Sequence, residues 1–255
     1  MDETVAARPA STVLLVRDGA TGLEVFMVVR HHKIDFASGA LVFPGGSVDP
    51  DDFAIAADPA RCEADATLDE RGRALRVGAI RETFEECGVL LARPRGSAAL
   101  IDGARCAAIA AKAPGRSFPE LIAAEDLSLA LDTLTPFAHW ITPPVMPKRF
   151  DTHFYIVAAP PDQIARHDGS ESVDSTWINP ARALTGADAG TYTMVFATRL
   201  NVQMLGESHD AASAIAASRA RRIVTVEPKA VKSEAGLTLT IPREAGYGEQ
   251  TVFTI

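Results

Sequence analysis

Three glutamates near the end of one expected helix are the residues whose types and spacing suggest chemistry. Glu82 stands three residues before Glu85 and four before Glu86, so on a helix the three carboxylates share one face. Each like-charge pair at this spacing costs about 0.2 to 0.5 kcal/mol, and anions in a last turn also oppose the helix dipole. A divalent cation such as Mg²⁺, which prefers oxygen ligands, would resolve this repulsion.

A solvated acidic helix face is the alternative explanation of the same three residues. Two neighbouring features favour the metal. Pro44-Gly45-Gly46 closes a strand upstream, and Gly88 directly follows the helix, where a left-handed cap belongs. We therefore expect the glutamates to form a metal site.

The elements around this helix predict an α+β fold. Expected strands span 12–17, 23–30, 40–43, 89–92, 138–142, 149–159 and 172–178, and expected helices span 74–87, 97–112, 119–131, 180–184, 194–205 and 210–220. Residues 47–73 are rich in Asp, Pro and Ala and predict a surface excursion with a short helix. Residues 222–226 and 237–241 predict a terminal hairpin, within 222–245. Since no linker interrupts the chain, we expect one domain over 1–255 with an ordered core at 10–245.

Composition limits the partners and the location of the protein. A net charge of −8 argues against a broad nucleic-acid-binding face, although a small anionic substrate can bind where a metal supplies positive charge. The apolar runs fall short of the roughly 20 residues that cross a bilayer. The N-terminus lacks a secretory pattern, and Cys62, Cys87 and Cys106 form no C-x-x-C pair. We expect a cytoplasmic protein with a small-molecule partner, without nucleic-acid or membrane partners; a homodimer is left open.

The segment Arg81–Val89, taken with Gly46, resembles the signature of the Nudix hydrolases, G-x5-E-x7-R-E-U-x-E-E-x-G-U, where U is bulky and aliphatic. The resemblance implies a Nudix-type α/β/α sandwich with a mixed sheet, and hydrolysis of nucleoside diphosphates linked to another group with Mg²⁺ or Mn²⁺. It implies that Arg81, Glu82, Glu85 and Glu86 are the catalytic residues, and that Glu82, Glu85 and Glu86 bind the metal together with Gly45. Arg81 would orient one glutamate through an ion pair, and Glu82 or Glu85 would act as the base. Gly45 and Gly46 would shape a loop whose carbonyl reaches the metal, with Gly46 beside the substrate.

Two departures from this signature concern the residues between Gly46 and the helix. Arg81 follows Gly46 by 35 residues where the family has 14, so 35 − 14 = 21 residues are inserted, within 47–73. Asp52 stands where the family has its first glutamate, and Thr83 replaces the bulky aliphatic residue. The role of the first family glutamate is therefore left open.

Segments 36–46, 80–91, 140–143 and 147–152 resemble one branch of this family, the peroxisomal coenzyme A diphosphatases and their bacterial relatives. That likeness implies cleavage of coenzyme A or acyl-CoA to 3′,5′-ADP and (acyl-)phosphopantetheine. Two alternatives stay open. One is a different nucleotide substrate, such as a nucleotide sugar, a dinucleotide or an oxidised nucleotide. The other is a Nudix-like domain that binds nucleotide without hydrolysing it.

Basic residues near the glycine loop and at one strand start are candidate phosphate ligands. They are Arg30 and Lys33, and Lys148 and Arg149. A solvated loop and a strand-end charge pair explain the two groups equally well. Asp151 and Glu171 are candidate accessory carboxylates, whereas His139 and His153 are expected to pack within strands.

Overall fold

The computed structural model describes residues 5–30, 39–62, 67–167, 172–234, 236–248 and 251–254. Its centre is an eight-stranded sheet with the order β10-β7-β8-β1-β2-β3, in which β4 also pairs with β1 and β9 with β2. These strands are β1 (Arg8–Gly19), β2 (Gly22–Arg30), β3 (Leu41–Val42), β4 (Gly45–Ser47), β7 (Thr135–Ile141), β8 (Phe150–Ala158), β9 (Ser172–Ile178) and β10 (Thr225–Val226). β1 runs parallel to β8 and β10 parallel to β7, while the other pairs are antiparallel. The expected mixed sheet is confirmed.

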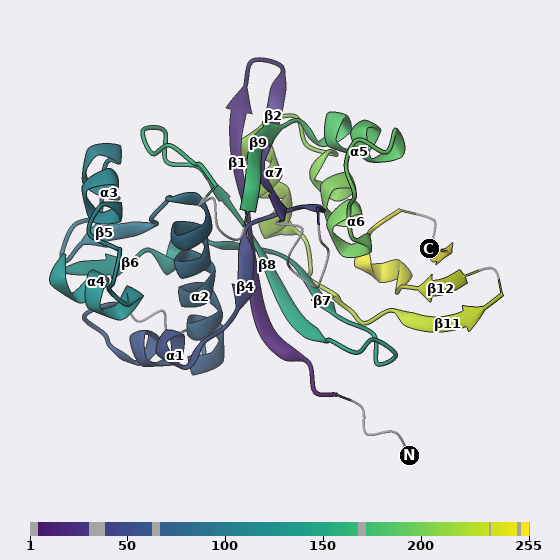
Figure 1. Ribbon diagram of the computed structural model, residues 1–255, viewed down its shortest axis with the longest axis horizontal. Coiled ribbons are helices and arrows are strands. Elements are labelled where there is room, and N and C mark those ends of the chain that lie inside the picture. Colours follow the sequence, from purple (N-terminus) through teal and green to yellow (C-terminus); the bar gives the residue numbers. More distant parts are fainter. Residues whose placement is uncertain are drawn as a thin grey trace.

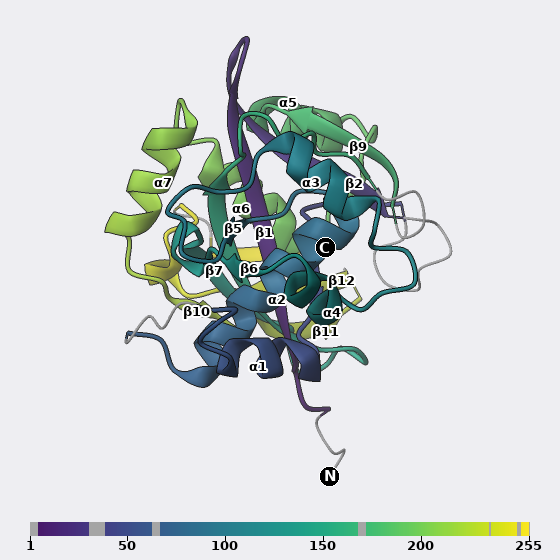
Figure 2. The same cartoon turned by 90° about the vertical axis from the view of Figure 1, so that its left-hand side faces the viewer.

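Helices lie on both sides of this sheet. One side carries α1 (Pro50–Ala57), α2 (Glu70–Cys87), α3 (Gly103–Ala110) and α4 (Phe118–Ala124), on the left in Figure 1 and facing the viewer in Figure 2. The other side carries α5 (Pro180–Asp188), α6 (Phe196–Leu205) and α7 (Ala211–Ala220). The layers form the expected α/β/α sandwich. In the described part of the chain, no helix is both long and apolar enough to cross a membrane.

Shorter elements complete both layers. β5 (Ala92–Pro94) pairs with β6 (Leu127–Leu129), and a three-stranded sheet joins β11 (Lys229–Ser233), β12 (Gly236–Thr240) and β13 (Val252–Thr254). The 3₁₀ turns are η1 (Leu131–Thr133) and η2 (Arg243–Ala245). β6 and η1 replace the end of a helix expected over 119–131, because α4 already stops at Ala124.

Strand β1 shows how the sequence builds a core on each face of the sheet. Val13 and Leu15 are fully buried in the cluster that includes α2, whereas Leu14 and Val16 are fully buried in the cluster that includes α6 and α7. Side chains of a strand alternate between the faces of its sheet. A continuous apolar run therefore indicates a central strand covered by helices on both sides.

Helix α2, which carries the glutamates, has defined signals at both ends. It begins four residues before the expected residue 74, at Glu70, where the Asp69 side chain accepts a hydrogen bond from the Gly72 N–H. Gly88 ends it in the left-handed conformation, with φ of 69°. The predicted glycine cap is confirmed.

Most described residues of 47–73 are exposed or partly exposed, but the expectation that this segment stays outside the core is wrong. The short helix exists as α1, but α1 packs on α2, and Ile55, Ala56 and Cys62 belong to the core cluster beneath it. Asp52 is itself 0% exposed. An acidic segment can be buried in this way when its charge is paired, as that of Asp52 is with Arg81.

The expected terminal hairpin is also placed differently. Residues 222–226 contribute β10, which joins the large sheet beside β7, and the hairpin consists of β11 and β12. Strand β10 is two residues long, which is too short a pattern to predict its parallel pairing with β7 from the sequence.

Candidate functional site

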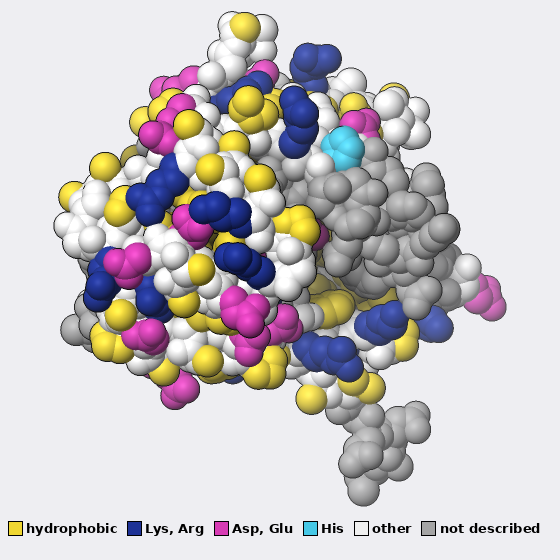
Figure 3. Space-filling view, turned by 60° about the vertical axis from the view of Figure 1, so that its left-hand side comes forward, with side chains coloured by type: hydrophobic (Ala, Val, Ile, Leu, Met, Phe, Trp, Pro, Cys, Tyr) yellow, Lys and Arg dark blue, Asp and Glu magenta, His cyan; other side chains and the backbone are white. Residues whose placement is uncertain are grey.

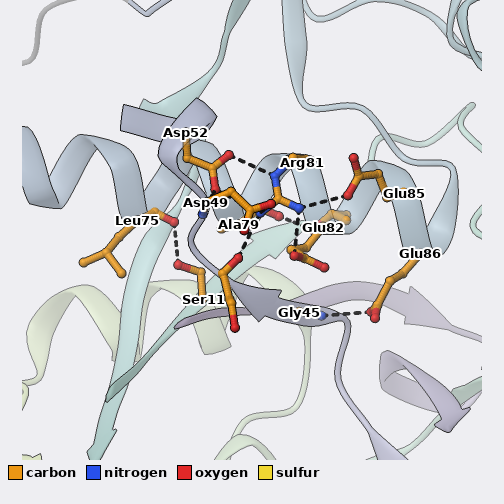
Figure 4. A network of polar contacts seen from close by, with 12 residues as sticks. Ser11, Gly45, Asp49, Asp52, Leu75, Ala79, Arg81, Glu82, Glu85 and Glu86 are labelled. Carbon is orange, nitrogen blue, oxygen red and sulfur yellow. Dashed lines mark hydrogen bonds and ion pairs between the residues drawn. The ribbon is translucent and has the colours of Figure 1, made fainter. Parts of the chain in front are cut away.

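Arg81 is the centre of the polar network on α2. Its Nε donates to Asp52 Oδ1 and one terminal nitrogen donates to Asp52 Oδ2, both at 2.9 Å (Figure 4). Asp52 is 0% exposed and Arg81 is 7% exposed. A bidentate pair of this kind gives both charges close partners inside the protein and fixes the plane of the guanidinium group.

The remaining donors of Arg81 reach the glutamates and the glycine loop. One terminal nitrogen donates to Glu82 Oε1 at 2.8 Å and to Glu85 Oε2 at 2.9 Å, and the other also donates to the Ser47 carbonyl at 2.9 Å. Burial alone would lower the pKa of Arg81, but the hydrogen bond to Asp52 and the nearby carboxylates raise it above its ordinary value. The guanidinium stays charged and aligns two of the glutamates.

The glycine loop approaches the same face of α2. The Gly45 N–H donates to Glu86 Oε2 at 2.9 Å, and Glu86 is 7% exposed. A Cβ atom at Gly46 would lie 2.6 Å from Glu82 Oε1, and one at Gly45 would lie 2.3 Å from the Ser11 carbonyl oxygen. Gly45 also has φ of 153°. Side chains at these two positions would push the loop off the glutamates, so glycine is required there for a steric reason.

Negative charge is crowded at this site. Desolvation raises the pKa of Glu85, and the carboxylates of Asp52 and Asp49 add to this effect, against the opposing influence of Arg81. Arg81 is the cation that pairs with Asp49, Asp52, Glu82 and Glu85. Over the neighbouring surface of the helical layer, Figure 3 shows Lys and Arg side chains interspersed with Asp and Glu. An all-oxygen donor set with excess negative charge suits a hard divalent cation such as Mg²⁺ or Mn²⁺.

The glutamates are not yet at the mutual distances of metal ligands. Within the described residues, the group whose ligand atoms all lie within 4.8 Å of one another is His139, Asp151 and His153. Glu82 and Glu85 instead share one nitrogen of Arg81. A cation bound by all three glutamates would therefore require at least one of them to change its side-chain conformation.

Thr83 occupies the position where the family has a bulky aliphatic residue. It is fully buried, and its hydroxyl donates to the Ala79 carbonyl at 2.7 Å. The hydroxyl is thus satisfied within the helix, which makes the departure compatible with the core.

One pair of candidate phosphate ligands, Lys148 and Arg149, lies away from the glutamates of α2. Arg149 is 9% exposed, and its guanidinium donates to the carbonyls of Thr142 and Val5 and to Glu227. Lys148 is exposed in the same connection between β7 and β8. Asp151, which follows in β8, pairs with Arg71 in the first turn of α2. Arg71 precedes Glu86 by 15 residues, or roughly 22 Å along a helix, so this group lies at the other end of α2.

The other pair of candidate phosphate ligands, Arg30 and Lys33, precedes the glycine loop in the sequence. Arg30 is the last residue of β2, whose neighbour β3 leads into the loop at Gly45. The side chain of Arg30, Lys33 and the candidate carboxylate Glu171 lie outside the described residues.

His139 and His153 do more than pack within strands. Their rings stack at 4.0 Å between centroids, and His139 Nε2 lies 2.5 Å from Asp151 Oδ1. The sequence carried a signal for this group, since residues two apart on a strand, as in Asp151-Thr152-His153, point to the same face.

Known proteins support the family suggested by the glutamates. The family model described as the NUDT19 Nudix domain matches residues 54–191, more than half of the chain. A protein of Caenorhabditis elegans named "Putative nudix hydrolase 7" is 28% identical over 191 residues, which is 75% of this chain and 58% of that protein. The chain therefore spans little more than half the length of this relative. The crystal structure of a NUDIX hydrolase from Alicyclobacillus acidocaldarius is 29% identical with a TM-score of 0.70, over 84% of this chain and 97% of that one.

Proposed function

Because the chain belongs to the Nudix hydrolase family, we propose that it hydrolyses a diphosphate linkage in a nucleotide-derived small molecule, using Mg²⁺ or Mn²⁺. We propose coenzyme A or an acyl-CoA as the substrate, with 3′,5′-ADP and (acyl-)phosphopantetheine as the products. The location expected for this activity is the cytoplasm.

One observation supports the reaction above all others: α2 presents its glutamates to a glycine loop that approaches them closely. The Gly45 N–H holds Glu86, while Arg81, anchored on buried Asp52, aligns Glu82 and Glu85. The three carboxylates are the residues that would hold the cation. When bound, the cation would neutralise the diphosphate oxygens and lower the pKa of a water molecule.

The protein's own residues would then position the reactants and move one proton. Glu82 or Glu85 accepts the proton as the water oxygen forms its bond to phosphorus and the bond from phosphorus to the bridging oxygen breaks. Both lie against Arg81, whose retained charge keeps a deprotonated carboxylate available. Desolvation by burial raises the pKa of Glu85, and the carboxylates of Asp52 and Asp49 add to this effect, so Glu85 takes up a proton more readily than an ordinary glutamate in the absence of metal.

The substrate part of the proposal is supported by the matched family model and by the position of two cations in the sequence. The model is that of the NUDT19 Nudix domain, and the segments around the glycine loop resemble coenzyme A diphosphatases. Arg30 and Lys33 precede the glycine loop in the sequence, and we keep both as the proposed ligands of a 3′-phosphate because of that position and their positive charge. Arg149 is left out of this proposal, because three protein acceptors already engage its guanidinium.

A panel of diphosphates tests the proposal. The purified chain is assayed under matched Mg²⁺ with coenzyme A, acetyl-CoA, ADP-ribose, NADH and nucleoside triphosphates, and the products are identified by chromatography. We expect the two coenzyme A compounds to be cleaved fastest, to 3′,5′-ADP. Glu86→Gln should abolish most turnover of every compound that the parent cleaves. Faster cleavage of ADP-ribose would overturn the substrate, and no Mg²⁺-dependent cleavage would overturn the reaction.

A further inference from the structure

A second group of metal-ligating side chains lies on the sheet beneath the start of α2. His139 comes from β7, and Asp151 and His153 come from β8. One ligand atom of each lies within 4.8 Å of the others. Asp151 Oδ1 is 2.5 Å from His139 Nε2 and 3.8 Å from His153 Nε2, so one carboxylate oxygen faces both imidazole rings.

The register of the sheet places these residues on one face. His139 is the direct partner of His153 across β7 and β8, and His153 is the partner of Ser11 on β1. The Ser11 hydroxyl donates to the Leu75 carbonyl of α2 at 2.6 Å, which identifies this as the face toward α2. Asp151, two residues before His153 on β8, points the same way. The group is therefore built by two adjacent strands, β7 and β8, rather than by loops.

Contacts around the group orient its ligand atoms. His139 Nδ1 lies 2.8 Å from Thr225 Oγ1 on β10, so its Nε2 is turned toward Asp151. Asp151 Oδ2 pairs with Arg71, which leaves Oδ1 for the two rings. Partners of this kind commonly fix the ring orientation of histidines that bind metal and hold the carboxylates beside them.

Open space adjoins the group. His139, His153 and Thr225 line a pocket of about 290 Å³ with Arg76 and Tyr155 among its other walls. Arg76 stands over the Tyr155 ring, with its guanidinium carbon 5.0 Å from the ring centroid. A water molecule or a small anion could enter this pocket and complete the coordination of an ion held by three protein ligands.

We propose that His139, Asp151 and His153 bind a divalent transition-metal ion, best matched by Zn²⁺, at a site separate from the glutamates of α2. Two imidazole nitrogens with one carboxylate oxygen and an open position form a donor set that suits zinc, whereas Mg²⁺ prefers oxygen ligands alone. Ligand atoms around a tetrahedral zinc ion are about 3.3 Å apart, given bonds of about 2.0 to 2.1 Å. The present distances from Asp151 Oδ1, 2.5 Å to His139 Nε2 and 3.8 Å to His153 Nε2, lie on either side of this value, so metal binding requires the first to lengthen and the second to shorten.

The positive charges nearby set the expected strength of binding. Arg71 and Arg76 are the cations beside the group, and Asp151 is its carboxylate. Two guanidinium groups oppose a further cation, so we expect a dissociation constant on the order of micromolar rather than nanomolar. The site does not depend on the proposed diphosphatase reaction, because Arg71 precedes Glu86 by 15 residues, roughly 22 Å of helix.

Metal binding to the intact protein tests this site without using activity. Chelator-treated protein is titrated with Zn²⁺ by calorimetry and with Co²⁺ by visible absorption, in Mg²⁺ at millimolar concentration so that the carboxylate site is supplied. We expect one equivalent of Zn²⁺ per chain and the absorption bands of low-symmetry, four-coordinate Co²⁺. His139→Ala and His153→Ala should each weaken binding at least about tenfold, and Thr225→Val should weaken it about tenfold through the loss of ring orientation.

Two control variants locate the ion. His209→Ala removes an exposed histidine elsewhere and should leave Zn²⁺ affinity unchanged. Glu86→Gln should also leave it unchanged, whereas a zinc ion held by the α2 glutamates would be lost. Circular dichroism checks the fold, and His139→Gln and His153→Gln replace any alanine variant that unfolds. Zn²⁺ binding weaker than about 100 µM in the parent, or binding that survives both histidine substitutions, would overturn the proposal.

Discussion

Replacing Asp52 is the sharpest test of the buried network. Asp52 is 0% exposed, and both of its carboxylate oxygens accept hydrogen bonds from Arg81 at 2.9 Å. Its Oδ2 also accepts from the Asp49 N–H at 2.8 Å, within the capping box of α1. Asp52→Ala therefore removes one partner of a buried ion pair and part of a helix cap.

The size of the stability loss in Asp52→Ala follows from these contacts. Breaking a buried pair by removing one partner costs about 3 to 5 kcal/mol, and losing a cap costs about 1 kcal/mol. Arg81 keeps Glu82, Glu85 and the Ser47 carbonyl as acceptors, which favours the lower end of the first range. We expect a loss of about 4 kcal/mol in the free energy of unfolding. For a chain of this size that corresponds to a fall of roughly 8 to 16 °C in Tm.

Urea unfolding and a thermal scan in chelator measure this loss. Asp51→Ala is the matched control, because Asp51 is exposed in the same turn of α1, and it should change stability by no more than about 0.5 kcal/mol. A loss below about 1 kcal/mol for Asp52→Ala, or one equal to that of the control, would refute the assignment of Asp52 as the structural partner of Arg81.

Gly78→Ala offers an independent check, because its effect on stability should change sign when Asp52 is also replaced. A Cβ at Gly78 would lie 2.9 Å from Asp52 Oδ2, a carboxylate that Arg81 holds in place. Gly78→Ala should therefore destabilise the parent. In the Asp52→Ala background the contact is gone, and the same substitution should stabilise the protein by up to about 1 kcal/mol through helix propensity. Stabilisation in both backgrounds would contradict the packing of Asp52 against α2.

Three further outcomes follow from the site. Glu85→Gln should leave the stability of the metal-free protein unchanged or higher at neutral pH. The pKa of Glu85 is raised in the folded state, so ionisation of Glu85 lowers the free energy of unfolding as pH rises through that pKa. Thermal scans across pH should therefore show any gain in Tm disappear in acid. The kcat/KM for dephospho-coenzyme A should be about tenfold to a hundredfold lower than that for coenzyme A. Arg30→Ala or Lys33→Ala, but not Lys148→Ala, should erase this preference for coenzyme A. Equal rates of the parent enzyme on the two substrates would contradict the prediction. Burial raises the pKa of Cys62 to about 11, and Cys87 and Cys106 are buried as well. A thiol reagent at pH 8 should therefore react with the chain only after unfolding. Rapid reaction of the folded protein would contradict the burial of these thiols.

Elements with strong local signals were predictable from the sequence. The hairpin of β1 and β2 follows from two β-rich runs around Asp18–Gly22, and α2 ends at Gly88 as its spacing indicates. In each case the information lies within a few residues. Boundaries failed where local pattern was weak, as in residues 119–131, where α4 gives way to β6 and η1.

Burial of charge was not predictable, because it depends on partners far along the chain. Asp52 was expected at the surface, yet its partner Arg81 lies 29 residues later. Nothing near Asp52 distinguishes it from exposed Asp51. The histidine group was predictable in part, because Asp151 and His153 share one face of β8, but His139 meets His153 only through the register of β7 and β8.

The contacts of Asp52 also show how the Nudix signature accommodates its insertion. Asp52 follows Gly46 by six residues, as the first glutamate of the signature does, but precedes Arg81 by 29 residues instead of eight. All 29 − 8 = 21 inserted residues therefore fall between Asp52 and Arg81. Asp52 of α1 contacts Arg81 and Gly45 of the glycine loop contacts Glu86, so the segment from Gly45 to Asp52 contacts the glutamate helix at both of its ends. Both oxygens of Asp52 accept hydrogen bonds from Arg81 at 0% exposure, so Asp52 holds Arg81 in place, and the function proposed above assigns the metal to the three glutamates alone.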